Sequence, residues 1–124
     1  MTAAEPMATD FLSRWFGVLD SDTPERVLEM IAPDFRFAVL WAVDGAAAEF
    51  GGGRAELEGY LAQREPDGQF HHVDVNTRDG GREVAFGHTT RHGERLATFT
   101  AAAELDATGR LRRLFAARTT GIAF

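Results

Sequence analysis

Residues 69–118 have the sequence QFHHVDVNTRDGGREVAFGHTTRHGERLATFTAAAELDATGRLRRLFAAR, and this stretch decides the fold. Apolar and polar residues alternate in it over 70–78, 83–91, 95–106 and 111–119. Glycine-containing turns separate the four segments, and glycine supplies the positive φ angle that tight hairpins need. We therefore expect an antiparallel four-stranded meander with one apolar face. The side chains that we expect on this face are His71, Val73, Val75, Val84, Phe86, His88, Phe99 and Leu105.

Two helices are predicted near the N-terminus, after a loose tail of residues 1–8. Apolar residues recur at helical spacing in the next segment, which predicts an amphipathic helix over 9–20. Thr23-Pro24-Glu25 supplies an N-cap, a proline at the first helical position and an acid in the first turn. A second helix is therefore expected to begin there, and Pro33 is expected to end it.

A hairpin and a third helix are predicted between these helices and the meander. Residues 34–43 and 46–50 are expected to form two strands that turn at Asp44-Gly45. The segment 54–64 has helical character, and Pro66-Asp67-Gly68 is expected to close it. The resulting order predicts one α+β domain over residues 1–124, with helices on one side of a curved antiparallel sheet.

Composition and charge exclude several kinds of function. The net charge of −6 argues against nucleic acid, because binding it requires a basic face that neutralises phosphates. The absence of cysteine excludes disulfides, thiolate metal sites and cysteine nucleophiles. The N-terminus has no basic-then-apolar signal pattern, and no apolar run approaches the roughly 20 residues of a membrane span. We therefore expect a cytoplasmic protein that binds neither nucleic acid nor a membrane.

Several short motifs, taken in order, resemble the nuclear transport factor 2-like superfamily, in particular its SnoaL-like (polyketide cyclase) and ketosteroid-isomerase-like branches. The motifs are the helix 11–19 with Asp20-Ser21-Asp22 after it, Met30-Ile31-Ala32-Pro33-Asp34-Phe35, Phe50-Gly51-Gly52-Gly53-Arg54, His71-His72-Val73 and residues 105–111 (LDATGRL). The resemblance covers nearly the whole chain. It implies a cone-shaped barrel whose three helices close over the concave face of the sheet around a pocket.

The reacting groups of the isomerase branch are missing from this chain. The resemblance places the oxyanion-hole tyrosine at Trp15, the general-base aspartate at Val39 and the protonated aspartate at Ala101. That chemistry is therefore not expected here, but the three positions should face the pocket. Strand alternation then adds Phe37, Trp41, Phe86, Phe99 and Arg118 to the expected lining.

Two histidines are the first candidates for catalysis. His71 and His88, expected on one face of neighbouring strands, can share general acid and base work. Arg118 can stabilise a developing oxyanion or form a structural salt bridge, and Tyr60 can donate a hydrogen bond. Either histidine can instead serve only a hydrogen-bond network. No third side chain has a position that completes a metal site, so neither a metal nor a cofactor is expected.

The resemblance implies a small-molecule lyase or isomerase, such as a cyclase or dehydratase, that acts on an aromatic or polyketide-like substrate without a cofactor. The expected catalytic residues are His71, His88, Arg118 and Tyr60. The expected wall residues are Trp15, Phe37, Val39, Trp41, Phe86, Phe99 and Ala101. A second hypothesis is a non-catalytic protein of the same fold that binds a small hydrophobic ligand or assembles as a dimer. Because relatives commonly form homodimers through the outer face of the sheet, a homodimer is expected in either case.

Overall fold

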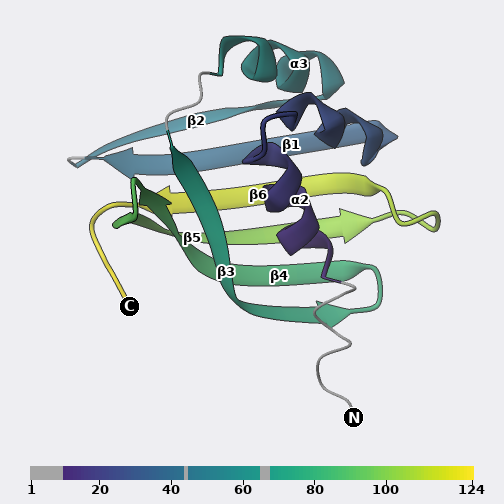
Figure 1. Ribbon diagram of the computed structural model, residues 1–124. Coiled ribbons are helices and arrows are strands. Elements are labelled where there is room, and N and C mark those ends of the chain that lie inside the picture. The colour runs from purple at the N-terminus through teal and green to yellow at the C-terminus, as the bar shows by residue number, and fades with distance from the viewer. Residues whose placement is uncertain (1–9, 44, 65–67) are drawn as a thin grey trace.

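One curved sheet of six strands, with helices on one face, makes up the computed structural model, which describes residues 10–43, 45–64 and 68–124 (Figure 1). The elements in chain order are α2 (Phe11–Leu19), the 3₁₀ helix η1 (Pro24–Glu29), β1 (Ile31–Val43), β2 (Ala46–Gly52), α3 (Arg54–Gln63), β3 (Gln69–Asp79), β4 (Arg82–Arg91), β5 (Glu94–Leu105) and β6 (Leu111–Thr119). The predicted tail 1–8, Asp44 of the predicted turn and Pro66-Asp67 lie outside the described residues. Within the described part, no helix is both long and apolar enough to cross a membrane.

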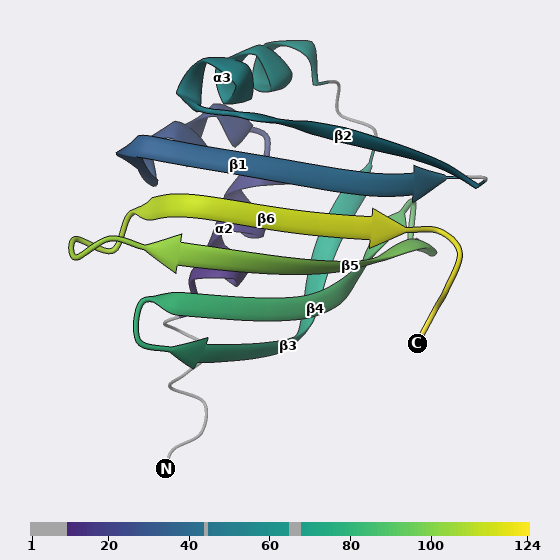
Figure 2. The ribbon, with the colours of Figure 1, turned by 180° about the vertical axis from the view of Figure 1, so that it is seen from behind.

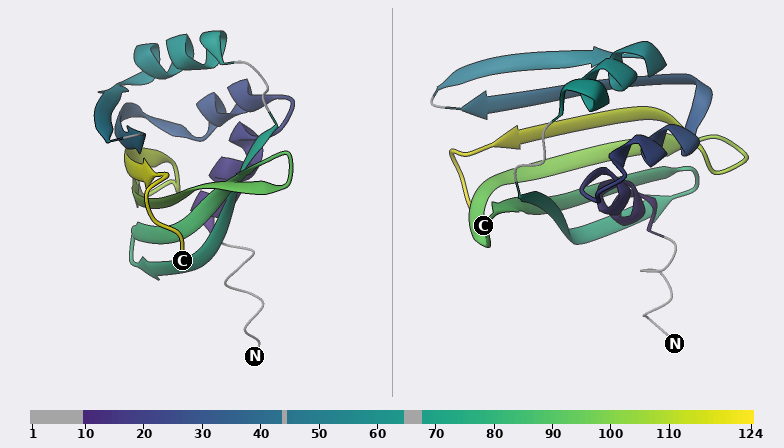
Figure 3. Two further views of the ribbon diagram at one scale, coloured as in Figure 1. Left: turned by 90° about the vertical axis from the view of Figure 1, so that its left-hand side faces the viewer. Right: turned by 45° about the horizontal axis from the view of Figure 1, so that its top comes forward.

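The strands lie in the order β2-β1-β6-β5-β4-β3, and the sheet curls into a half-barrel (Figure 3). Strands β3 to β6 form the predicted meander, and β1 with β2 forms the predicted hairpin. The cone-like α+β fold is confirmed. The prediction of a wholly antiparallel sheet is wrong, because β1 pairs in parallel with β6 while the other neighbouring pairs are antiparallel, and the sheet is therefore mixed.

The second helix is shorter than predicted, ending at Glu29 as a 3₁₀ helix, and Pro33 lies within β1. The pairing of β1 with β6 is irregular between Ile31 and Arg36. Proline, which has no N–H to donate, is tolerated at such an irregular strand start. The prediction that the second helix extends to Pro33 is therefore wrong, because the helix ends at Glu29 and residues 31–33 already belong to β1.

Helix α2 crosses the concave face of the sheet, called here the inner face (Figure 1). Its apolar stripe is buried against that face, as the helical spacing predicts. The sheet residues buried on the inner face are Phe35, Phe37, Ala85, Phe99, Ala101, Ala103 and Leu114. The opposite face, called the outer face, carries no helix in the described part of the chain (Figure 2).

The prediction for β4 is wrong by one residue. Glu83, Ala85, Gly87 and Thr89 are buried on the inner face, whereas Val84, Phe86 and His88 lie on the outer face. Alternation alone could not identify the inner side, because the outer face is itself apolar along its centre. In β3, the pairing shifts between Val73 and Val75, which sends Val75 to the outer face and leaves it exposed.

The reversed orientation of β4 brings a carboxylate to the N-terminus of α2. Glu83 is fully buried and accepts the N–H groups of Phe11 and Leu12 at 3.1 and 2.7 Å. Asp10 is the N-cap and accepts the Ser13 N–H at 3.1 Å. Carboxylates are favoured at this end of a helix because its N–H groups are unpaired and its dipole is positive.

Asn76 joins the two carboxylates, since its amide nitrogen donates to Asp10 at 2.8 Å and to Glu83 at 2.9 Å. Burial would raise the pKa of Asp10, but hydrogen bonds that its carboxylate accepts, two of them from Ser13, outweigh it and hold this pKa below the ordinary value of 3.8. The first turn of α2 is thus attached to β3 and β4 through side-chain hydrogen bonds. We expect these bonds to fix where the helix lies on the sheet.

Replacing Glu83 by alanine is expected to lower the free energy of unfolding by about 3 kcal/mol, since buried donors at Phe11, Leu12 and Asn76 lose an acceptor. Urea denaturation followed by circular dichroism measures the change. Glu94→Ala, on the exposed start of β5, is the matched control and should stay within about 0.5 kcal/mol of the wild type. Equal effects of the two substitutions would contradict this account of the helix.

Candidate active site

His71 lies on the inner face near the start of β3, between two aromatic rings. Its imidazole stacks on Phe16 of α2, with centroids 4.4 Å apart and planes 15° from parallel. The edge of Phe99 of β5 meets it at a centroid distance of 5.3 Å. The side chain of His71 keeps 16% of its surface exposed. The ring is therefore held by packing, while a small part of the side chain stays accessible.

Asp20, the C-cap of α2, binds His71 through both the backbone and the ring. Its carboxylate accepts the His71 N–H at 2.6 Å, and both of its oxygens lie 3.1 Å from Nδ1. An ionised carboxylate can only accept, so Nδ1 carries a proton, and in the neutral form of the ring Nε2 presents its lone pair. No group in the described part of the chain hydrogen-bonds to Nε2. This is the arrangement of an oriented general base.

Arg64, which follows α3, completes the support of this carboxylate. Its guanidinium lies 3.2 Å from Asp20 Oδ1 and also donates to the carbonyl of Leu19. The C-terminus of a helix is the negative end of its dipole, so an acid there is unfavourable unless a cation compensates it. Arg64 provides that compensation, with its side chain and that of Asp20 largely buried at 18% and 5% exposure.

Gly87 provides the space in which the rings of His71 and Phe99 meet. It is buried on β4 opposite Phe99, between the strands that carry the two rings. A Cβ placed on it would lie 2.0 Å from the carbonyl oxygen of His72 and 2.9 Å from Cζ of Phe99. The ring of Phe99 therefore crosses β4 only because residue 87 has no side chain.

Gly87→Ala is expected to lower the free energy of unfolding by at least about 2 kcal/mol, because both backbone and a buried ring must move. Thermal unfolding measured by circular dichroism tests this. Gly59→Ala on α3 is the control, since its Cβ would meet nothing within 4 Å, and helix propensity predicts a gain of up to about 1 kcal/mol. An unchanged melting temperature for Gly87→Ala would show that the packing is not as tight as described.

The inner face next to His71 carries a row of the predicted pocket residues. Pairing places Trp41 beside Arg118, Arg118 beside Phe99 and Phe99 beside Gly87. The pairing of β6 is continuous over Arg113–Thr119, with no bulge. Arg118 therefore lies on the inner face, as strand alternation predicts. The neighbouring row contains Val39, Ala116 and Ala101, and Phe37 lies one row farther from His71. His71, Phe99, Arg118 and Trp41 thus share one end of the inner face.

Other predicted site residues lie elsewhere. Trp15 is buried between Phe11 and Phe35, with ring centroids 6.2 and 6.3 Å away. Phe35 lies six residues before Trp41 in β1, which is roughly 20 Å along a strand, so Trp15 packs far from the end of the inner face that carries Trp41. Tyr60 is 40% exposed on α3 and lies beside Phe50 of β2, with ring centroids 6.2 Å apart. Phe86 contacts Phe124 on the outer face.

His88 is also on the outer face, where it forms a separate cluster. Its Nδ1 lies 2.8 Å from Asp74, its ring stacks on His72 at 4.8 Å, and His72 contacts Thr90 at 2.8 Å. The sheet separates this cluster from His71, so the predicted pair of catalytic histidines is not formed. In the described ranges, no three histidine or acidic side chains are placed to hold a metal ion.

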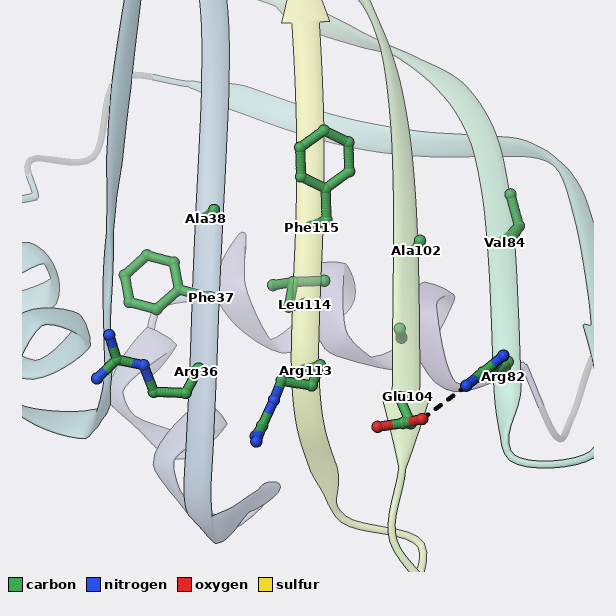
Figure 4. A pocket seen from close by; sticks show the side chains of 11 residues that line it. Arg36, Phe37, Ala38, Arg82, Val84, Ala102, Glu104, Arg113, Leu114 and Phe115 are labelled. Carbon is green, nitrogen blue, oxygen red and sulfur yellow. Dashed lines mark hydrogen bonds and ion pairs between the residues drawn. The ribbon is translucent and has the colours of Figure 1, made fainter.

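The outer face carries a hollow of about 530 Å³ over its central strands. Figure 4 shows one edge formed by the charged row Arg36, Arg113, Glu104 and Arg82, with Ala38, Phe115, Ala102 and Val84 above it. Pairing adds a second apolar row that consists of Leu40, Ala117, Thr100, Phe86 and Val75. The row that begins with Ala38 and the row that begins with Leu40 are together called the outer band. Leu40, Phe115, Val84 and Val75 of this band are exposed to solvent.

Sequence reasoning did not select Asp20 and Arg64, although they organise the candidate site. The motif Asp20-Ser21-Asp22 was noted only as part of the family resemblance. An available signal was the position of Asp20 at the end of the predicted helix, where an acid opposes the helix dipole. Arg64 gave no comparable signal, because a basic residue at a helix C-terminus is favoured on its own.

Comparison with known proteins identifies the fold. No family model and no curated protein matches the sequence. A solved structure named as an isomerase of the SnoaL-like family from Agrobacterium tumefaciens is 16% identical, with a TM-score of 0.60, covering 95% of this chain and 98% of that one. A structure named as a ketosteroid isomerase from Kribbella flavida is 20% identical, with a TM-score of 0.65, covering 94% and 79%.

The same fold also carries another chemistry. An epoxide hydrolase of Mycobacterium tuberculosis is 14% identical, with a TM-score of 0.62, covering 86% of this chain and 78% of that one. The chain therefore has the SnoaL-like and nuclear transport factor 2-like fold, which confirms the predicted resemblance. At these identities the likeness establishes the fold, and the reaction must be argued from the site.

Proposed function

We propose that this chain, which has the SnoaL-like fold, is a cofactor-independent lyase or isomerase that acts on a small aromatic or polyketide-like molecule. The observation that carries the proposal is the Asp20–His71 pair, in which Nδ1 is bound to the carboxylate and Nε2 is open. An imidazole oriented in this way can remove a proton and return it within one reaction. Such a reaction needs no redox group.

The proposed reaction begins when Nε2 of His71 takes a proton from the carbon next to a substrate carbonyl. Asp20 then stabilises the imidazolium, and Arg64 keeps the carboxylate in place. Arg118, on the adjoining row of the inner face, supports the negative charge that develops on the enolate oxygen. Return of the proton to another carbon completes an isomerisation, and its transfer to a departing hydroxyl completes a dehydration.

Aromatic side chains around His71 favour an aromatic or polyketide-like substrate. Phe16 and Phe99 flank the imidazole, and Trp41 lies on the row that adjoins it. Flat, apolar surfaces bind planar molecules through burial and ring contacts, while a few polar groups orient them. Tyr60 is left out of the proposed mechanism, because it lies beside Phe50 and is largely exposed.

Exchange of the α-protons of 2-tetralone in D₂O, followed by NMR, tests for a general base at His71. We expect the protein to accelerate the exchange and His71→Ala to remove about 10²- to 10⁴-fold of that acceleration. His72→Ala is the matched control, because it changes the neighbouring histidine on the outer face. If His71→Ala exchanges protons as fast as the wild type, His71 is not the base.

A second candidate function is a dimeric assembly that uses the outer face. The observation that favours it is the outer band with its hollow of about 530 Å³, since exposed apolar patches commonly mark interaction sites. Two copies that meet through their outer bands would bury Leu40, Phe115 and Val84 while leaving both inner faces free. A homodimer is therefore compatible with the proposed enzyme as well as with a purely structural role.

Substitution of Ala102 by arginine, at the centre of the outer band, is expected to convert a dimer into a monomer, because it inserts a charge into an apolar interface. Sedimentation velocity at micromolar protein concentration measures the mass. Ala55→Arg on the exposed surface of α3 is the control and should leave the wild-type mass unchanged. A wild type that sediments as a monomer would exclude the assembly.

A further inference from the structure

The hollow on the outer face has an exposed aromatic ring beside it. Ala102 of β5 lines the hollow, and the pairing of β5 with β6 places Phe115 directly opposite Ala102 on the same face (Figure 4). Phe115 is 44% exposed, and the hollow of about 530 Å³ has room for a ring of this size. A ring and a recess that fits it therefore lie one strand apart at the centre of the sheet.

A two-fold axis along the strands, between β5 and β6, would bring the ring of each copy to the hollow of another. Such a rotation places two outer faces against each other and sets β6 of one copy over β5 of the second at the same level. Phe115 then faces Ala102 of the second copy, and symmetry forms the same contact in reverse. Stacked sheets lie about 10 Å apart, so an aromatic side chain of one sheet reaches the small residues of the other.

The curvature of the sheet favours contact along this axis. The inner face, which α2 crosses, is concave, so the outer face is convex (Figure 3). Strands β6 and β5 lie at the centre of the strand order, and two convex surfaces approach most closely at their centres. Arg36 on β1 and Arg82 on β4 lie farther from the axis, where the two faces diverge and their charges stay in water.

The same axis also matches charges at the centre of the sheet. Arg113 and Glu104 are directly opposite each other on β6 and β5, two residues along each strand from Phe115 and Ala102. The axis therefore brings Arg113 of each copy to Glu104 of the other. Charge pairs of this kind fix the register of an interface.

Both charged groups have hydrogen-bonding capacity left for such a partner. Arg113 donates to the carbonyls of Asp34 and Arg112 through Nη1, and the described residues accept nothing from its other two nitrogens. Each oxygen of Glu104 accepts from one arginine, Arg82 at 3.3 Å and Arg112 at 3.4 Å, and a carboxylate oxygen can accept a second bond.

An axis that runs across the strands gives no such match. It would set each strand over its own copy in the reverse direction, so that Arg113 and Glu104 would face the row of Thr119 and Thr98. Charges that lose water without gaining a charged partner are unfavourable in an interface. Phe115 would also miss the hollow.

We propose that two copies of this chain associate about a two-fold axis along the strands between β5 and β6, with Phe115 of each copy in the hollow beside Ala102 of the other. The inference rests on the second candidate function, assembly through the outer face, and adds to it the axis and the residues that meet. Arg113 and Glu104 form two equivalent ion pairs between the copies. Both inner faces point away from the interface.

Exchange of the ring and the small residue tests the contact. Phe115→Ala removes the ring, and Ala102→Phe fills the hollow from its own copy. Each should raise the dimer dissociation constant at least about 10-fold, because symmetry changes two contacts at once. The double variant exchanges ring and recess across the same axis and should return to within about threefold of the wild type. Sedimentation velocity over a concentration series measures these constants.

Phe70→Ala is the matched control, because Phe70 is 49% exposed but lies on the edge strand β3. It should leave the dissociation constant within about twofold of the wild type. A double variant no tighter than the weaker of the two single variants would overturn the inference.

The direction of the axis is tested by the distance between two spin labels. The chain has no cysteine, so Ala107→Cys in the exposed turn between β5 and β6 carries one label per copy. With the proposed axis both turns lie at one end of the dimer, and double electron–electron resonance should give about 15–25 Å, since the sheets are about 10 Å apart. With an axis across the strands the turns lie at opposite ends, roughly 40 Å apart at about 3.3 Å per residue.

These measurements separate the inference from the function on which it rests. A dimer whose labels lie more than about 35 Å apart would overturn the proposed axis and leave assembly through the outer face intact. A wild type that sediments as a monomer at micromolar concentration would overturn both.

Discussion

Carboxylates hold both ends of helix α2, and the packed inner face and the candidate site both depend on this attachment. At the N-terminus, Asp10 and Glu83 accept backbone N–H groups, which the helix dipole favours. At the C-terminus, Asp20 opposes the dipole and is stabilised by Arg64 and His71 instead. The first contact therefore follows from general helix chemistry, whereas the second requires specific partners and suggests a use for the carboxylate.

The two faces of the sheet are apolar for different reasons. The inner face receives the stripe of α2 and contains the aromatic packing around His71. The outer band is exposed in the described structure and carries small residues at its centre, which leaves a hollow rather than a filled surface. A sheet with one face for ligand and the other for a second copy would divide its surface between two functions. Fold alone cannot establish that division, because proteins of this fold carry different chemistries.

The candidate site combines features that stabilise the fold with features that do not. Asp20 and Arg64 form an ion pair that satisfies both groups. Gly87 removes a side chain so that two rings can meet. Thr89, in contrast, has a buried hydroxyl without a hydrogen-bond partner among the described residues. Cytoplasmic location and catalysis without a cofactor stay predictions.

The sequence by itself determined the order of the elements of this protein, except for the boundary between the second helix and β1. Helical spacing identified α2, glycine turns separated the strands of the meander, and short motifs identified the fold. It also placed His71, Phe99 and Arg118 on the inner face, through strand alternation together with the positions that the family resemblance set inward.

Only the tertiary structure decided which side of β4 faces inward. Val84 and Phe86 contribute to an apolar outer band, so a pattern of period two fits either orientation, and a one-residue error moved His88 to the wrong face. The partners of His71 also come from distant parts of the chain. Asp20 reaches it from the end of α2, and Arg64 supports Asp20 from the end of α3. The sequence determined local periodicity, and the packing of the helices and strands determined which residues form the site.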